Sequence, residues 1–238
     1  MKRSQINSLM AEADAFFKSH HVFLPPFAYW SPAQWQQQGA EVAEIVDSRL
    51  GWDISDYGLN DFARYGLLLF TLRNGGPKSW QRGFAKHYAE KVMIAEAGQT
   101  HQMHMHLRKL EDLINRGGGT LAIELYNATD DDRLADSVVR VNCDGIWREL
   151  AAGSIVRLQP GESITLTPRL YHRFWAEGGR VLMGEVSSVN DDLVDNRFYE
   201  MIGTGRFSDI DEDETPVYLL CTEYVRFWGG AQSAQRQG

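Results

Sequence analysis

Hydrophobic residues in the first fifty positions recur at three- and four-residue spacing, which is typical of amphipathic helices. Residues 4–20 carry such a face, made of Ile6, Leu9, Met10, Ala13, Phe16 and Phe17. Ser31 followed by Pro32 is a helix start signal, because the hydroxyl caps the first turn and proline fits its first position. The pattern predicts one helix over residues 4–20 and a second from Pro32 to about Leu50, ending at Gly51.

Further along, the spacing changes to the period of two that is typical of β-strands. The segment TLAIELYNA, residues 120–128, alternates in this way. Turn signals separate such segments at Asn74-Gly75-Gly76, Asp144-Gly145, Pro160-Gly161 and Gly178-Gly179. A last apolar strand is expected near Tyr218–Cys221. Short strands at this spacing predict an antiparallel sandwich or barrel.

No linker or internal repeat divides the chain, so we expect a single domain overall. Residues 1–60 are expected to form a helical N-terminal extension that packs on the barrel. Residues 61–238 are expected to form the β-barrel itself. The predicted fold class is therefore all-β, with an α-helical N-terminal extension.

Charge and cysteine content narrow the setting of the protein. The 238 residues include 24 basic and 32 acidic side chains, a formal net charge of −8. An acidic chain without basic tracts argues against nucleic acid or a membrane surface as a partner. No signal peptide or membrane-spanning apolar run is evident, and Cys143 and Cys221 make no disulfide framework. These features predict a cytoplasmic protein.

His104 and His106 are the first sign of chemistry. They are two residues apart, so on a strand both imidazoles project from one face. Glu111 follows five residues later, far enough for the chain to bend and return its carboxylate. Such ligands suit a divalent ion such as Mn, Fe, Co, Ni or Zn. His172, the one histidine after His106, is our candidate for a fourth ligand, with a structural histidine as the alternative.

The spacing around these residues resembles the first cupin motif, G(X)5HXH(X)3-4E(X)6G, at every fixed position. The matching residues are Gly98, His104, His106, Glu111 and Gly118. Around His172 the chain resembles the second motif, G(X)5PXG(X)2H(X)3N, more loosely. Gly161 and Pro168 are present, but the internal Gly and terminal Asn are absent and two spacings differ by one. The resemblance implies a cupin β-barrel (jelly roll) with a metal site.

Six segments carry a wider likeness over roughly residues 51 to 220: GWDISDYG, GLLLFTLRNG, YAEKVMI, HMHLRKLEDLINRGGG, EVSSVNDDLVDNRF and GRFSDIDEDE. They are similar to the D-lyxose isomerase family of cupin sugar isomerases. That resemblance implies His104, His106, Glu111 and His172 as metal ligands. It also implies Mn2+ as the cofactor, with Co2+, Fe2+, Ni2+ or Zn2+ as alternatives. The implied reaction converts D-lyxose to D-xylulose, and D-mannose to D-fructose, through a cis-enediol.

The acid and base residues come from chemistry rather than from the motif. An enediol mechanism needs a base that moves a proton between C1 and C2. Glu185 is our candidate, because on the strand VLMGEV it shares a face with Val181 and Met183. Burial should raise its pKa and a bound cation should lower it, which would leave a base near neutrality. Lys91 and Lys109 are expected to donate to the carbonyl or to hydroxyls, with solvated surface lysines as the alternative.

Three residues are assigned to substrate binding: Arg206 at the far end of the sugar, Trp175 as a pocket wall and Asp192 in the loop after Glu185. Phe174 is a second candidate for that wall, and core packing is the alternative for both aromatic residues. Asp191 and Asp195 are interpreted as parts of a solvated acidic loop, and the acidic run 209–214 as surface.

Two other classes of function remain open at this point. A cupin with histidine and carboxylate ligands can be an O2-dependent dioxygenase that needs Fe(II). A sugar-binding cupin without turnover is the second alternative, although such a module needs fewer ionisable groups. The expected partners are a small sugar and, because sheet edges need cover, a second copy of the chain in a homodimer.

Overall fold

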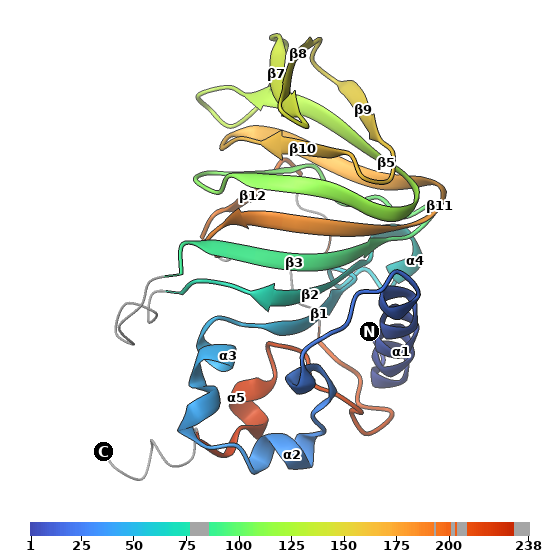
Figure 1. Ribbon diagram of the computed structural model, residues 1–238, viewed down its shortest axis with the longest axis vertical. Coiled ribbons are helices and arrows are strands. Elements are labelled where there is room, and N and C mark those ends of the chain that lie inside the picture. Colours follow the sequence, from blue (N-terminus) through green and yellow to red (C-terminus); the bar gives the residue numbers. More distant parts are fainter. Residues whose placement is uncertain (77–85, 193, 201–202, 204–208, 231–238) are drawn as a thin grey trace.

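The computed structural model describes residues 1–76, 86–192, 194–200, 203 and 209–230. The strands are β1 (Gly51–Ser55), β2 (Leu67–Arg73), β3 (Tyr88–Ala95), β4 (His104–His106), β5 (Glu111–Ala128), β6 (Leu134–Ala135), β7 (Val139–Cys143), β8 (Ile146–Leu150), β9 (Ser154–Leu158), β10 (Ser163–Leu166), β11 (Leu170–Ser188) and β12 (Asn196–Phe198). The helices are α1 (Arg3–Ser19), η1 (Pro26–Tyr29), α2 (Pro32–Gln36), η2 (Ala40–Val42), α3 (Ala43–Asp47), α4 (Phe62–Tyr65) and α5 (Tyr224–Phe227). The expected all-β architecture with a helical N-terminal segment is confirmed (Figure 1).

The strands form one antiparallel sheet in the order β1-β2-β3-β11-β5-β10-β7-β8, with β4, β6, β9 and β12 attached beside this path. The two longest strands, β5 and β11, pair along their whole length and bend together. Gly118 lies at the bend with φ of +94°, and a Cβ there would lie 2.1 Å from the carbonyl oxygen of Arg180. Glycine therefore lets two long strands turn a corner and curl the sheet (Figure 1).

Two turn predictions have different outcomes. Asp144-Gly145 joins β7 to β8, with φ of +52° and +85°, as a tight hairpin requires. The turn predicted at Gly178-Gly179 is wrong, because β11 runs through these glycines as one strand. The register with β5 shifts there between Glu177 and Val181. A bulge absorbs the extra residues that we interpreted as a turn.

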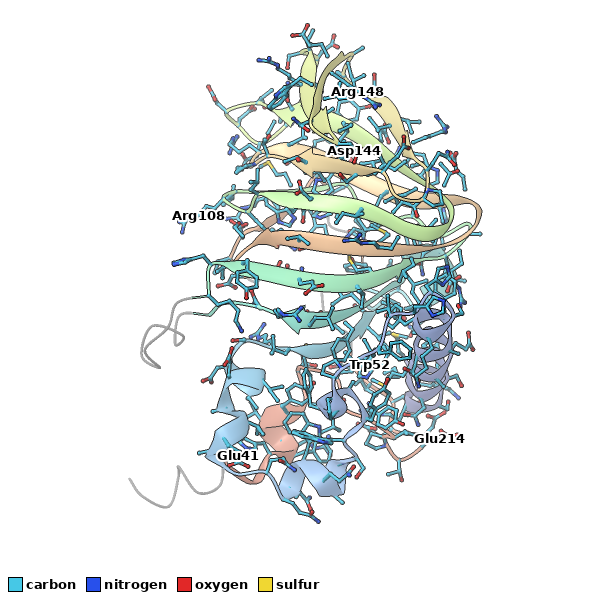
Figure 2. The ribbon with its side chains drawn as sticks, in the orientation of Figure 1. Glu41, Trp52, Arg108, Asp144, Arg148 and Glu214 are labelled. Atoms are coloured by element: carbon cyan, nitrogen blue, oxygen red, sulfur yellow. The ribbon has the colours of Figure 1, made fainter. Side chains whose placement is uncertain are left out.

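The strands bury different residues on their two faces. The concave face holds the larger core, which includes Leu69, Met93 and Met183. The convex face of β1–β3 packs against α1, whose Ile6, Met10, Ala13 and Phe17 are buried as predicted. Trp52 lies between the sheet and this helical layer, and its indole donates to the carbonyl of Ala28 (Figure 2).

The second predicted helix, residues 32–50, is wrong in its length. Ser31 does cap α2 through a capping box, but the chain leaves the helix after Gln36. Gly39 is extended there (φ −92°, ψ −153°), so the remainder forms the short η2 and α3. The predicted strand at Tyr218–Cys221 is also wrong, since it reduces to a single bridge between Leu220 and Trp52.

The sheet itself begins at β1, which pairs with β2 along its whole length. The boundary that we placed at residue 60 stays a prediction. Among the residues that the structure describes, no helix is both long and apolar enough to cross a membrane.

Candidate metal centre

A cavity opens into the concave side of the sheet, and strands far apart in the sequence supply its walls. β4 contributes two histidines, β11 contributes His172, Phe174 and Glu185, and β3 contributes Lys91. Glu111 reaches it from the first position of β5. The cavity has a volume of about 40 Å³, which is room for about three water molecules.

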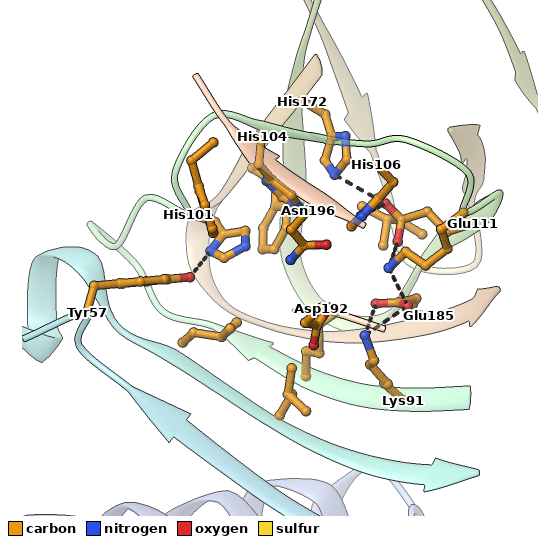
Figure 3. A pocket seen from close by; sticks show the side chains of 17 residues that line it. Tyr57, Lys91, His101, His104, His106, Glu111, His172, Glu185, Asp192 and Asn196 are labelled. Atoms are coloured by element: carbon orange, nitrogen blue, oxygen red, sulfur yellow. Dashed lines mark hydrogen bonds and ion pairs between the residues drawn. The ribbon is translucent and has the colours of Figure 1, made fainter. Parts of the chain in front are cut away.

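Three histidines converge on one side of this cavity (Figure 3). Each histidine places one ring nitrogen within 4.8 Å of a ring nitrogen of the other two. The three residues, His104, His106 and His172, are all buried. His104 and His172 are direct partners in the pairing of β4 with β11. Glu111 completes the group, with its Oε1 3.3 Å from His106 Nε2 and 3.2 Å from His172 Nε2. The four residues proposed from the sequence as ligands therefore lie together.

Backbone carbonyls set the tautomers of two of these histidines. The Nδ1 of His104 lies 2.9 Å from the carbonyl oxygen of Gln102, and that of His172 lies 3.1 Å from the carbonyl oxygen of Leu170. Because a carbonyl only accepts, each Nδ1 carries the proton and donates it. In a neutral imidazole, a proton on Nδ1 leaves the lone pair on Nε2, which is the arrangement that metal-binding histidines use.

The protonation states suit a metal centre as well. Burial lowers the pKa of His104 well below its ordinary value, and burial also lowers the pKa of His106. Burial alone would raise the pKa of Glu111, but Lys109 and His106 outweigh it and hold that pKa well below its usual range. At neutral pH the site thus offers neutral imidazoles and an ionised carboxylate, the forms that bind cations.

Next to these residues lies a group of four buried charges, Lys91, Lys109, Glu111 and Glu185, which we call the cavity cluster. The Nζ of Lys109 lies 2.6 Å from Glu111 Oε2 and 3.0 Å from Glu185 Oε1. The Nζ of Lys91 lies 3.2 Å from Glu185 Oε1. Both ammonium groups also donate to Asn190 Oδ1, at 2.8 and 3.2 Å. The alternative of solvated surface lysines is therefore wrong.

The same contacts correct our expectation for the pKa of Glu185. Its inward orientation with Val181 and Met183 is confirmed, since all three side chains are buried on the concave face. Burial raises its pKa, as expected, but Lys109 and Lys91 lower it further, so the net shift is downward. Two cations close to one carboxylate outweigh its desolvation. Glu185 is thus ionised at neutral pH rather than poised near neutrality.

Asp195 is not the solvated loop residue that we interpreted it to be. It is 8 % exposed, and its carboxylate accepts the backbone N–H groups of Arg108 and Lys109 at 2.9 and 3.0 Å. Those amides lie in the turn between β4 and β5, so Asp195 holds that turn and the two ligand-bearing strands together. Asp191, by contrast, is exposed as expected.

The predicted substrate-binding residues separate. Asp192 lines the cavity. Trp175 does not, because side chains alternate along β11 and Phe174 takes the inward position; the indole of Trp175 donates instead to Glu177 at 3.2 Å. Of the two adjacent aromatic candidates, Phe174 lines the cavity and Trp175 does not. Arg206 lies outside the described residues.

Sequence reasoning missed part of the cavity wall, to which Tyr57, His101 and Asn196 belong (Figure 3). Phe198 also belongs to it and packs against the rings of Tyr57 and His104. The hydroxyl of Tyr57 lies 3.1 Å from His101 Nδ1. Tyr57 has φ of +57°, a conformation that costs energy for a bulky side chain and that directs the ring into the cavity. The one available signal was the position of His101 inside the five-residue gap of the motif.

Comparison with known proteins agrees with this geometry. The sequence model of the D-lyxose isomerase family matches residues 1–224. This chain belongs to the D-lyxose isomerase family. It is 52 % identical over 230 residues to the D-lyxose/D-mannose isomerase of Serratia proteamaculans, with 95 % of this chain and 99 % of that protein covered. The enzyme of the same name from Escherichia coli O157:H7 is also 52 % identical, with 95 % and 100 % covered.

Solved structures resemble the fold over most of its length. L-ribose isomerase from Cellulomonas parahominis, solved with L-ribose, aligns with a TM-score of 0.58 and 16 % identity, covering 89 % of this chain and 98 % of that one. L-ribose isomerase from Acinetobacter sp. DL28 with L-ribose gives a TM-score of 0.56 at 16 % identity, with the same coverage. At this identity the likeness concerns the fold alone, and it confirms the cupin β-barrel.

Proposed function

We propose that the protein is a metal-dependent aldose–ketose isomerase that converts D-lyxose to D-xylulose and D-mannose to D-fructose. The names of the two relatives at 52 % identity support the substrates. The observation that carries the proposal is the joining, in one buried cavity, of three histidines and a carboxylate with a lysine–glutamate cluster. The first group suits a cation, and the second suits proton transfer.

The donor set fits a divalent metal. His104, His106 and His172 offer three imidazole nitrogens, and Glu111 offers an ionised oxygen within 3.3 Å of two of them. These four residues would hold the ion. Mixed nitrogen and oxygen ligands suit Mn2+, Co2+, Fe2+, Ni2+ and Zn2+ alike, and we propose Mn2+ because the family resemblance implies it. Such an ion supplies a Lewis acid that stabilises negative charge on the sugar oxygens O1 and O2.

The remaining chemistry falls to the cavity cluster. Glu185 is ionised, faces the cavity and is our proposed base for moving the proton between C1 and C2 of the sugar. Lys91 and Lys109 keep it ionised and orient it, and either ammonium can donate to a developing oxyanion. The lowered pKa makes Glu185 a weaker base, so these donors must compensate by stabilising the enediolate.

Substrate entry requires the cavity to widen. Its volume of about 40 Å³ holds a few water molecules, and a sugar occupies more space. Asp192, which lines the cavity from the connection between β11 and β12, is proposed to contact the sugar. Phe174 replaces Trp175 as the proposed aromatic wall. For Arg206 the proposed contact with the far end of the sugar stands on the sequence alone.

The decisive experiment is a panel of aldoses and ketoses, assayed after EDTA treatment and after repletion with individual metals. We expect interconversion of D-lyxose with D-xylulose and of D-mannose with D-fructose, together with deuterium uptake at C2 from D2O. No interconversion with any ion would contradict the proposal. Oxygen uptake dependent on Fe(II) would favour the dioxygenase, and sugar binding without turnover would favour the binding module.

We also propose a homodimer, formed through an edge of the sheet as the sequence led us to expect. The apolar face of α1 is already covered by the sheet. The edge strand β8 instead exposes Ile146 (64 %) and Trp147 (57 %), and an edge of this kind invites pairing. Light scattering at low micromolar concentration should give a dimer mass, and Trp147→Glu should shift it to the monomer. A monomer mass for the unaltered protein would contradict the proposal.

The two cysteines are consistent with the expected reducing, cytoplasmic location, which stays a proposal. Cys143 is buried in the barrel core, whereas Cys221 is buried in a separate cluster with Trp35 and Tyr224. The two thiols therefore do not pair with each other. Mass measurement of the protein with and without thiol alkylation under native redox conditions would test the location, since both thiols should be reduced.

A further inference from the structure

Asn196 occupies a special place in the cavity wall. It is the first residue of β12, and it lies directly opposite His106 in the antiparallel pairing of β12 with β4. Residues directly opposite in such a pair project to the same face of the sheet. Asn196 accordingly lines the cavity beside the histidines (Figure 3). Its amide therefore borders the space in which a ligand next to the metal would lie.

The side-chain oxygen of Asn196 is buried without a hydrogen bond. Its Oδ1 is one of two buried side-chain polar atoms in the described residues that lack a partner. Folded proteins satisfy nearly all such atoms, because a buried unmade hydrogen bond costs stability, so the exceptions need an explanation. An acceptor that faces a ligand cavity and has no protein donor is explained if the donor is on the ligand.

Asn115 shows what a structural asparagine looks like in the same sheet. Its Nδ2 donates to the carbonyl oxygens of Gly119 and Leu158, both at 2.9 Å, and its Oδ1 accepts from the backbone N–H of Gly117 at 2.9 Å. It is fully buried and holds the bend of β5. Asn196 has no comparable set of contacts for its oxygen among the described residues.

We propose that Asn196 is a substrate-binding residue whose Oδ1 accepts a hydrogen bond from a hydroxyl of the sugar. The inference rests on the proposed isomerase function, since a sugar brings hydroxyl donors to this cavity. The cavity cluster serves the reacting carbons, and Asn196 is not one of its members. Its amide then orients the sugar through a hydroxyl that does not react. Such a group makes the site specific, because a sugar without the matching hydroxyl leaves the buried acceptor without a hydrogen bond.

The proposal predicts that replacing Asn196 weakens sugar binding without lowering stability. Replacement of a structural residue would lower stability. Asn196→Leu replaces the amide by an apolar group of similar size. The metal-free variant should unfold at the same temperature as the unaltered protein or higher, because the unmade hydrogen bond is gone. The KM for D-lyxose should rise about 10- to 100-fold, since the sugar hydroxyl loses its acceptor. Asn115→Leu is the matched control and should lower the unfolding temperature clearly.

Deoxy sugars can identify which hydroxyl of the sugar donates to Asn196. Inhibition constants of D-mannose analogues deoxygenated at C3, C4 or C6 are measured with the unaltered protein and with Asn196→Leu. For one analogue the loss of affinity seen with the unaltered protein should disappear in the variant, because the contact is already absent. Mn2+ affinity, measured by titration without sugar, should be the same for both proteins.

Several results would overturn the inference while leaving the proposed function intact. These are an unchanged KM in an active Asn196→Leu enzyme, additive effects for every analogue, or destabilisation as large as that of Asn115→Leu. A loss of Mn2+ affinity would assign the amide to the metal instead of the sugar. If the unaltered protein neither turns over nor binds D-lyxose and D-mannose, the proposed function fails, and this inference fails with it.

Discussion

The cavity cluster can be compared with a second group of paired charges at the start of α1, in which the cation is buried and the carboxylates are not. Arg3 is fully buried, and its guanidinium pairs with Glu212 through Nε and Nη2 at 2.8 and 2.9 Å and with Glu223 on the other side. We call these three residues the terminal cluster. A guanidinium fork that meets two carboxylates uses its donors in fixed directions. The terminal cluster therefore has a structural role, because it connects the first helix to the last part of the described chain.

The cavity cluster uses lysines where the terminal cluster uses an arginine. An ammonium group is a point charge with rotatable donors, and Lys109 divides its contacts among Glu111, Glu185 and Asn190. Its neighbours face a cavity, and one of them, Glu185, keeps an ionised carboxylate there. Burial and charge pairing occur in both clusters. The reactive site differs from the structural ion pairs in two ways: a cavity lies beside its charges, and its ammonium donors can rotate.

The largest loss of function should come from replacing the histidines beside the cavity cluster, whereas replacing Arg3 of the terminal cluster should leave metal binding unchanged. His104→Ala or His106→Ala removes one of two nitrogens held by a single short strand. Metal affinity should fall by about 100-fold or more, because the loss of a residue that only supports a ligand already costs about 10- to 100-fold. Turnover should fall with it. Metal content and activity after dialysis measure both effects. Arg3→Met, as the control, should bind metal normally; unchanged metal content in either histidine variant would argue against the centre.

The next largest effect should come from the carboxylate of the cavity cluster. Glu185→Gln keeps shape and hydrogen-bonding capacity but removes the base. Turnover should fall about 10²- to 10⁴-fold, with metal content retained. Deuterium uptake at C2 should vanish in parallel.

Glu177→Gln is the matched control for that variant, because Glu177 lies on the same strand, faces Arg157 outside the cavity and should leave activity unchanged. Near-normal turnover of Glu185→Gln would move the search to Asp192, the nearest acidic candidate in the cavity wall. The acidic run 209–214 is no longer a candidate, since its contacts are to the start of α1.

The terminal cluster should respond in stability and not in catalysis. Arg3→Met leaves Glu223 and the partly exposed Glu212 without their cation. Breaking a fully buried pair typically costs about 3–5 kcal/mol, and because water screens Glu212 we expect a smaller loss than that. Denaturant unfolding measures that loss, while turnover per folded molecule should stay unchanged. Arg157→Met removes an exposed pair with Glu177 and should change the stability little, because solvent screens such a pair. Equal losses in the two variants would show that burial does not set the difference.

The parts of the site that were predictable from the sequence are those encoded by short spacing. His104, His106 and Glu111 lie within eight residues, and strand alternation alone placed Glu185 inward with Val181 and Met183. The same alternation, counted from His172, places Phe174 rather than Trp175 on the cavity face, so this choice too was within reach of the sequence.

The parts that were not predictable depend on long-range contacts. Asp195 and Asn196 looked like members of a solvated loop, yet the first caps two amides 86 and 87 residues away and the second pairs opposite His106. Tyr57 reaches the cavity through a left-handed backbone conformation that its sequence does not announce. The acidic run 209–214 is exposed, as expected, but its pairing with α1 was not foreseen.

The smallest effect concerns acid stability of the terminal cluster. The hydrogen bond from Arg3 lowers the pKa of Glu212 below its ordinary value of 4.5. Because the folded state holds this proton less tightly than the unfolded state, the stabilisation is complete above about pH 4.5. It is lost as the pH falls through the lowered pKa. Glu212→Gln removes the titrating group, so its free energy of unfolding should depend less on pH below 4.5 than that of the unaltered protein. Urea unfolding at intervals from pH 3 to 7 makes the comparison, with Glu214→Gln as the exposed control. Parallel curves for all three proteins would show that Arg3 holds Glu212 through shape rather than charge.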